Sequence, residues 1–259
     1  IKRRDAVGDW YQIDGLRGYD KILKSNSTAA EATDANVLGV SGTTCTLKST
    51  LANGTYVISA TKAGLSSARQ TNTDGSVTST VSRNVLSGFA IVLYNGTGAN
   101  ATVGHGLGAA LKMVVAMSRS VASKNHCVYH AGITNSQNGG IYQNLTSAWN
   151  SDPIIFNNTA PTSTTVAIGT YLSPSAAAYL LYCYTDSAIQ KSFSYSGNGV
   201  ADGPNPYLGM KCGRTLVKNA SASEGWEIID STRDQTNVTK ALLELNTTSA
   251  ENIASDQLD

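Results

Sequence analysis

Short apolar runs separated by polar turns dominate the chain and predict an all-β protein. The most apolar run is Phe-Ala-Ile-Val-Leu-Tyr at 89–94, which ends at an Asn-Gly turn. Similar runs at 111–117 and 179–184 contain few charged residues. Further short runs in this region fall at 126–130, 141–142, 153–156 and 164–168. Short strands at this spacing, with Ser, Thr, Asn and Gly between them, are typical of a β-sandwich or jelly roll.

Strand-like runs also occur on both sides of this region. They lie at 10–14, 43–47, 56–60, 76–82, 214–218, 226–230 and 242–245. An Asn-Gly pair just before 56–60 favours a hairpin. Residues 241–245 leave two possibilities open, since so short an apolar run also suits a brief helix.

Two motifs near opposite ends of the chain match without a gap and indicate an internal repeat. The first contains Trp10, Asp14 and Arg17, and the same three residue types recur 216 positions later at Trp226, Asp230 and Arg233. A more diverged middle copy lies at 126–130. The motif Asn-Ser-Thr-Ala-Ala-Glu at 26–31 likewise returns at 246–251, with a weaker copy at 144–148. Repeats of roughly a hundred residues suit small β domains.

The repeats predict tandem β-sandwich (jelly-roll or lectin-like) units and set the domain boundaries. We expect the C-terminal part of a first repeat at 1–64 and a complete central repeat at 87–188. The N-terminal part of a third repeat would occupy 189–259. Residues 65–86 would form a linking strand or arm, with a flexible linker as the alternative. Because the chain opens and stops within a repeat, we expect it to be a piece of a longer protein.

Composition narrows the classes of partner. Charged residues make up 14% of the chain and the formal net charge is +1, so electrostatics give no reason to expect nucleic acid or an anionic membrane. No apolar run approaches the length of a membrane span. Cys45, Cys127, Cys183 and Cys212 form no CxxC pair, and we expect buried free thiols in place of a disulfide framework.

The three histidines are weak candidates for chemistry. His105 lies in a Gly-rich stretch, but no phosphate-loop Lys-Ser/Thr follows it, so we expect a turn residue beside a strand. His126 and His130 are four residues apart, which on a strand places them about 13 Å from each other, too far to share a metal. We therefore expect no metal site and no cofactor.

The repeated Trp, Asp and Arg residues are expected to be structural. Trp10 and Trp226 could be platforms for sugars, but an aromatic residue at a fixed repeat position usually fills the core. The pairs Asp14–Arg17 and Asp230–Arg233 are expected to be ion pairs or turn caps. No motif brings two carboxylates to one cleft, as a glycosidase requires, and no GxSxG elbow occurs. We expect no enzyme activity and name no catalytic or binding residue.

Three stretches carry a resemblance to a known family. They are 73–82, 87–92 and 96–108, with the long run from Asp74 to Gly108 the most specific. The chain there resembles a repeated domain of uncharacterised function found in tail-fibre-like and other virion structural proteins of tailed, often marine, bacteriophages. Pieces at 2–4, 8–11, 26–31 and 195–203 look like other parts of the same repeat. This chain departs from the family pattern in having Ala110-Leu111 where Pro is usual and His126 where Trp is usual.

The resemblance implies a phage virion protein, with a tail-fibre or appendage component that contacts the host surface as the first expectation. A capsid-decorating or head-fibre protein without a receptor-binding role is the alternative, and a polysaccharide depolymerase is a third hypothesis. Partners would be other virion proteins and a host surface glycan or protein. The family also implies a homo-oligomer, most simply a trimer. It supplies no catalytic residues.

Overall fold

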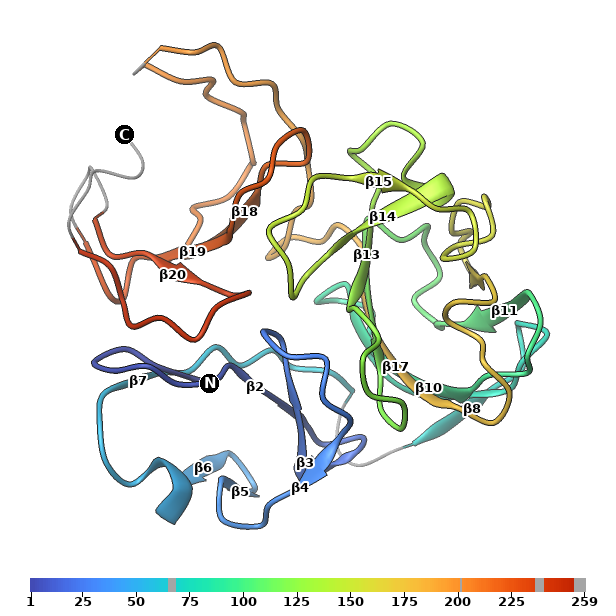
Figure 1. The fold of residues 1–259 in the computed structure, drawn as a ribbon, viewed down its shortest axis with the longest axis horizontal. Helices are drawn as coiled ribbons and strands as arrows, with labels where there is room; N and C mark the ends of the chain where they lie inside the picture. Colours follow the sequence, from blue (N-terminus) through green and yellow to red (C-terminus); the bar gives the residue numbers. More distant parts are fainter. Residues whose placement is uncertain (65–68, 201, 236–239, 254–259) are drawn as a thin grey trace.

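The computed structural model describes residues 1–64, 69–200, 202–235 and 240–253. Predicted segments at 65–68, 201, 236–239 and 254–259 lie outside the described residues. Three groups of strands surround a common centre (Figure 1). We call residues 1–64 the first lobe, 69–188 the central lobe and the described part of 189–253 the third lobe. The regular structure of the described residues is almost entirely β, as predicted.

One antiparallel sheet of eight strands organises the central lobe, in the order β15-β14-β13-β12-β17-β10-β9-β8. Its strands are β8 (Gln70–Asn72), β9 (Ser79–Asn84), β10 (Phe89–Asn95), β12 (Met113–Ser118), β13 (Cys127–His130), β14 (Gly139–Tyr142), β15 (Asn150–Ser151) and β17 (Ala178–Tyr184). A short 3-10 helix, Ser136–Asn138, precedes β14. Residues 69–86, expected as a linking strand or arm, supply β8 and β9 at the edge of this sheet.

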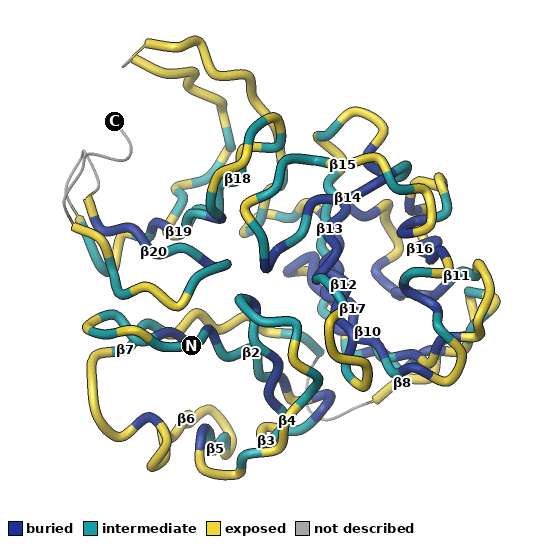
Figure 2. Tube along the Cα trace, viewed as in Figure 1, coloured by how far each residue is buried: buried dark blue, intermediate teal, exposed yellow. Residues whose placement is uncertain are grey.

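The apolar runs are nearly continuous because the sheet is buried on both faces. Side chains of a strand alternate between faces, so Ala90 and Val92 enter one hydrophobic core while Phe89 and Ile91 enter another. The neighbouring strands β12 and β17 divide their side chains in the same way. The sheet is therefore the middle layer of the protein (Figure 2).

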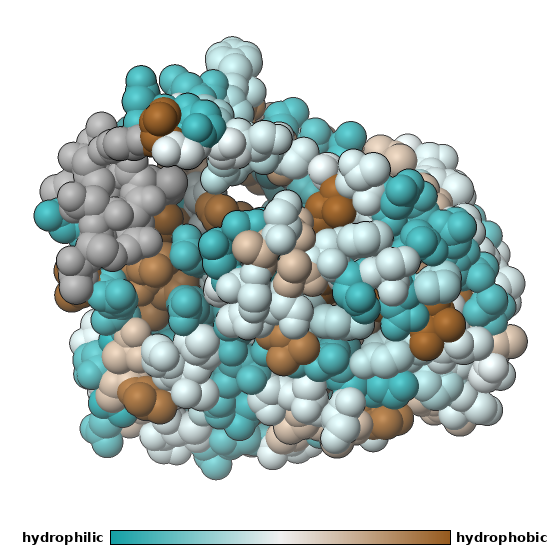
Figure 3. Space-filling view, turned by 45° about the horizontal axis from the view of Figure 1, so that its top comes forward, coloured by the Kyte–Doolittle hydropathy of each residue, from teal (hydrophilic) through white to brown (hydrophobic). Residues whose placement is uncertain are grey.

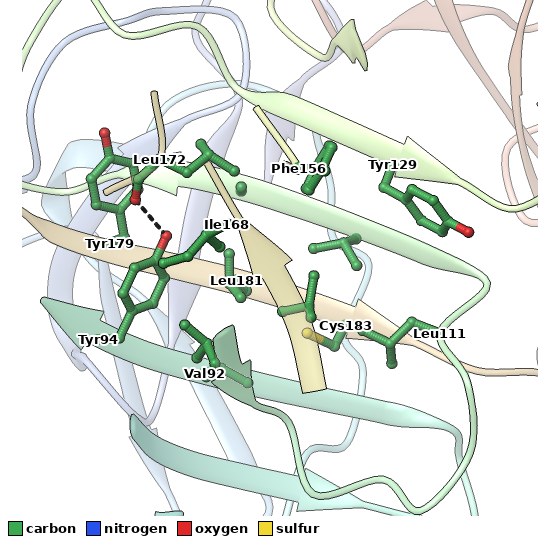
Figure 4. Packing of buried hydrophobic residues seen from close by; sticks show 14 of the residues in the cluster. Val92, Tyr94, Leu111, Tyr129, Phe156, Ile168, Leu172, Tyr179, Leu181 and Cys183 are labelled. Carbon is green, nitrogen blue, oxygen red and sulfur yellow. Dashed lines mark hydrogen bonds between the residues drawn. The ribbon is translucent and has the colours of Figure 1, made fainter. Parts of the chain in front are cut away.

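A small sheet covers the first face of the central sheet. It pairs β11 (Ala101–Gly104) with β16 (Thr165–Ile168). Val103 and Ile168 from this pair pack with Tyr94 and Leu181 from the central sheet. The Tyr94 hydroxyl donates a hydrogen bond of 2.8 Å to the carbonyl of Leu172 (Figure 4). The two layers form a β-sandwich.

The first and third lobes cover the opposite face. Leu23 and Trp10 of the first lobe, and Ile228 and Trp226 of the third, share one hydrophobic core with Met117 of the central sheet. The first lobe contains β1 (Lys2–Arg3), β2 (Tyr11–Asp14), β3 (Gly18–Lys24), β4 (Ala32–Thr33), β5 (Leu38–Ser41), β6 (Thr44–Leu47), a 3-10 helix Ser49–Leu51, and β7 (Tyr56–Val57). Its sheets are β2-β3-β4, β1-β7 and β5-β6. The third lobe contains one sheet, β18 (Arg214–Lys218), β19 (Trp226–Asp230) and β20 (Leu243–Glu244).

Two sequence expectations are wrong and a third is resolved. Residues 153–156 form turns, because Pro153 has no backbone N–H for a sheet and Asn157 adopts a positive φ of 50°. Cys127 and Cys183 are buried free thiols as expected, but Cys45 is exposed on the two-stranded β5-β6 sheet and Cys212 is only partly buried. Residues 241–245 contain the strand β20 and no helix.

Candidate functional site

A buried ion pair organises the turn between β2 and β3. Oδ1 of Asp14 accepts the backbone N–H groups of Leu16 and Arg17, at 3.1 and 2.9 Å. Oδ2 of Asp14 accepts Nε of Arg17 at 2.6 Å, and Nη2 of Arg17 donates to the carbonyl of Gln12. Asp14 and Arg17 are therefore both an ion pair and a turn cap. The Arg17 side chain is fully buried, so this pair differs from the exposed pairs that contribute little to stability.

Glu31 extends this ion pair to the central lobe. Its carboxylate accepts Nη1 of Arg17 at 3.0 Å and both Nε and Nη2 of Arg119, at 2.9 and 2.8 Å. Its backbone N–H also donates to the Arg119 carbonyl. Burial opposes ionisation of Glu31, but the hydrogen bonds from Arg119 and Arg17 outweigh it and lower its pKa. The four charged side chains join the first lobe to the central lobe, and we call this place the first corner.

The second corner, between the third and first lobes, repeats the arrangement. Asp230 accepts the N–H groups of Thr232 and Arg233, and its Oδ2 accepts Nε of Arg233 at 2.6 Å. Arg233 and Arg4 both donate to the carboxylate of Glu251, at 2.7 and 2.6 Å. The N–H of Glu251 donates to the Arg4 carbonyl. The residues that matched in the sequence thus make the same contacts in both corners.

The repeated tryptophans also link neighbouring lobes. Nε1 of Trp10 donates to the carbonyl of Glu244, and Nε1 of Trp226 to the carbonyl of Tyr142, at 2.7 and 2.9 Å. Backbone N–H groups of Trp10, Trp226 and His126 each donate to a capping asparagine, respectively Asn26, Asn246 and Asn144. Trp10 and Trp226 are 5% and 3% exposed. This confirms that they are core residues.

The third corner, between the central and third lobes, has the same backbone but different chemistry. The N–H of Trp149 donates to the carbonyl of Ala220 at 2.9 Å, the bond that Glu31 and Glu251 make in the other corners. His130 and Ile133 lie four and seven residues after His126, where the other copies have Asp and Arg. His130, Ile133, Trp149 and Ala220 therefore stand where the other corners have Asp, Arg, Glu and Arg. We call this uncharged place the open corner.

Two polar groups of the open corner have no hydrogen-bond partner among the protein atoms. They are Nε1 of Trp149 and Oε1 of Gln143, both buried. Gln143 is 6% exposed and directly follows β14. It is equivalent to Ser25 and Leu245, because each of these residues directly precedes a capping asparagine. Leaving a buried polar group unpaired costs about 1–3 kcal/mol, so the open corner is the place where this fold tolerates unsatisfied groups.

The open corner faces a cavity between the three lobes. The cavity has a volume of about 2860 Å³ and is lined by residues of all three lobes, with Gln143 and Trp149 among them. Its walls near the open corner also include Val128, His130, Ile133, Ile141, Leu216 and Trp226. The surface view shows an opening with hydrophobic and polar side chains at its rim (Figure 3). This volume exceeds that of a typical small-ligand pocket, so a specific site would occupy only part of it.

The structure places the histidines apart from one another in role. His105 directly follows β11, is fully buried, and its Nδ1 accepts the N–H of Leu107. His126 is buried, whereas His130 lines the cavity and its Nδ1 accepts the N–H of Gly132. Burial lowers the pKa of all three, to about 4 for His126. Among the described residues, no three His, Cys, Asp or Glu side chains form a group that could hold a metal ion.

Sequence analysis missed Trp149 and Gln143. The middle copy Asn-Leu-Thr-Ser-Ala at 144–148 is followed by Trp149, at the position where both other copies end in Glu. The substitution was visible in the sequence. Its importance depends on Arg119 and Arg4, which come from other lobes and are not marked by any local motif.

These features define a class: an all-β protein of three interlocked lobes, two joined by buried charge networks and one by an open, uncharged corner that faces a cavity. The chain belongs to the family described as a domain of unknown function (DUF7483), whose model matches residues 1–259. Comparison with curated proteins and with solved structures found no match. No helix in the described part of the chain is long and apolar enough to cross a lipid bilayer.

Proposed function

We propose that this protein is a structural component of a tailed-bacteriophage virion, in a tail fibre or similar appendage that contacts the host surface. The observation that carries the proposal is a long loop, residues 189–213 apart from 201, on a scaffold held by buried ion pairs. The loop lies at the upper left of Figure 1 and is largely exposed (Figure 2). Tyr195 and Tyr207 in it are 52% and 96% exposed. Exposed aromatic side chains on a rigid scaffold are typical of binding loops.

The sequence resemblance and the repeated corners support the finer parts of the proposal. Tandem repeats of jelly-roll or lectin type would explain why the first and third lobes share the same turn and the same capping asparagine. A homotrimer is proposed from the resemblance, and sedimentation analysis of the purified protein would test it. Other virion proteins and a host glycan or protein are the proposed partners.

Binding of labelled protein to host cells tests this function. Wild-type protein should bind saturably and compete with phage adsorption. Tyr207→Ser should weaken binding, whereas Leu86→Ser, which alters a side chain 89% exposed outside the loop, should not. Both substitutions remove exposed apolar surface and should change stability by less than about 0.5 kcal/mol. Absence of wild-type binding would favour the capsid-decorating alternative.

A depolymerase remains the second candidate because of two carboxylates. Glu224 and Glu227 both line the cavity. Burial, together with the nearby Glu224 and Glu244, raises the pKa of Glu227, the direction that a general acid requires. If the protein cleaves host polysaccharide, Glu227→Gln should abolish release of reducing ends. Equal release by wild type and Glu227→Gln would exclude this role for Glu227.

A further inference from the structure

The open corner differs from its two counterparts in a way that packing does not explain. In each of the other corners, two arginines and two carboxylates satisfy one another. At the open corner, Ile133 and Ala220 supply no such groups. A corner that only needed to hold lobes together would be filled by apolar side chains, as Leu245 does at the position of Gln143. Instead, this corner retains a buried amide and a buried indole N–H without protein partners.

The two unpaired groups have opposite hydrogen-bonding character. Oε1 of Gln143 can only accept a hydrogen bond, and Nε1 of Trp149 can only donate one. A hydroxyl group both donates and accepts, so one hydroxyl, or two adjacent ones, can satisfy both. Trp149 is half-buried and packs with Ile133 and Leu216 around the apolar core. Its indole therefore adds a flat apolar surface to the polar pair.

The charge of the open corner excludes strong selection for ions. The positions that carry Arg and Glu in the other corners are occupied here by Ile133, Ala220 and Trp149. Lys218, the nearest lysine in the sequence to Ala220, is held by the carbonyls of Thr146, Ala222 and Glu224. A ligand suited to this corner is therefore uncharged, rich in hydroxyl groups, and flat and apolar on one face.

We propose that the open corner binds a neutral saccharide, with a sugar ring against Trp149 and hydroxyl groups paired with Oε1 of Gln143 and Nε1 of Trp149. His130, at the end of β13, would contribute a further donor: its Nδ1 accepts the N–H of Gly132, which leaves the proton of the neutral ring on Nε2. The inference deepens the proposed host-binding function, on which its biological meaning rests. The physical argument for the site depends only on the corner itself.

The test uses the full chain and a printed array of oligosaccharides built from neutral hexoses and N-acetylhexosamines, with uronic-acid oligosaccharides as the charged comparison. The best-bound neutral oligosaccharide is then titrated calorimetrically. Trp149→Ala and Gln143→Leu should each weaken its binding about tenfold or more, the effect of about 1.4 kcal/mol from a lost hydrogen bond or stacking surface. Tyr19→Ala, on another wall of the same cavity, should stay within about twofold of wild type.

Gln143→Leu guards against misfolding as an explanation, because Leu245 occupies the equivalent position in the third lobe and the variant should be at least as stable as wild type. Three results would overturn the proposal: no neutral oligosaccharide binds, the charged oligosaccharides bind better, or both variants bind as tightly as wild type. Cell binding separates this inference from the proposed function. If Trp149→Ala binds cells normally, the saccharide site is wrong while host binding stands; saccharide binding without cell binding means the reverse.

Discussion

At the scale of single residues, His126 shows how one position of a repeated motif acquires a pH-dependent cost. It occupies the place of Trp10 and Trp226, and its backbone N–H makes the same bond to a capping asparagine. Burial lowers its pKa from 6.5 to about 4, although a contact with the Ser25 carbonyl acts in the opposite direction. Its Nδ1 has no partner among the protein atoms. The neutral imidazole is therefore the form that the folded protein accommodates.

This predicts a loss of stability on mild acidification. Below pH 6.5 the unfolded state binds a proton at His126 that the folded state does not bind until about pH 4. The free energy of unfolding should therefore fall as the pH drops from 6.5 to 4, by about 3 kcal/mol from this residue. His126→Trp should remove most of that slope, since an indole at this position can donate as Trp10 and Trp226 do. Urea unfolding at several pH values measures it.

The carboxylates provide the internal comparison for this experiment. Glu31 and Asp230 have lowered pKa values in the folded protein, so the stability they contribute is lost only as the pH falls through those lower values. Their effect is common to wild type and His126→Trp. An unchanged slope between pH 6.5 and 4 in His126→Trp would show that His126 is not the cause.

At the scale of elements, the turn between β2 and β3 depends on a charge pair that does not reach solvent. Register shifts between Gln12 and Asp14, and Asp14 then caps the turn. Removing one member of a buried pair leaves the other charge without compensation. The turn and the first corner are therefore one structural device.

Arg17→Met should lower the free energy of unfolding by about 3–5 kcal/mol. Arg3→Met is the matched control, because Arg3 pairs with Asp5 with side-chain exposures of 34% and 42%, and it should cost less than about 1 kcal/mol. Chemical denaturation of both variants at pH 7 gives the two values. Equal effects would mean that the Arg17 network contributes no more than an exposed ion pair.

Much of this element-level structure was predictable. The run 89–94 forms β10 because a strand buried on both faces needs apolar side chains at consecutive positions. The matching Trp, Asp and Arg residues correctly indicated equivalent turns. The run 153–156 failed because its apolar residues Ile155 and Phe156 fill the core from turns. Periodicity reports burial, and it does not distinguish a buried turn from a buried strand.

The site was harder to predict than the strands. Trp10 and Trp226 were correctly assigned to the core because a repeated aromatic residue fills the same space in each copy. Trp149 was missed because its neighbours, Ile133 and Ala220, are separated from it in the sequence and belong to two lobes. The sequence shows the missing Glu in the middle copy, but only the fold shows that the missing Arg partners belong to the same corner.

At the scale of the whole molecule, the third lobe completes the first. Trp10 donates to Glu244 and Arg4 pairs with Glu251. The third lobe also covers part of the second face of the central sheet. A chain that stops at residue 188 would expose this face and leave the Trp10 N–H and the Arg4 side chain without those partners.

Truncation after residue 188 should therefore lower Tm by about 10 °C or more and increase binding of a dye that reports exposed apolar surface. Truncation after residue 253, which keeps every contact described above, is the control and should leave both measurements unchanged. Thermal denaturation and dye fluorescence provide the readouts. A chain of residues 1–188 as stable as the full chain would show that the lobes fold independently.

The bond from Trp10 to Glu244 joins residues separated by 234 positions. Contacts over such separations form late, because the entropy of closing a long loop must be overcome before they stabilise anything. During synthesis the first lobe leaves the ribosome well before its partner exists, with Trp10 and the adjoining apolar face uncovered in the meantime. We therefore expect slow folding and a demand for chaperones that ends only when the last lobe has been made.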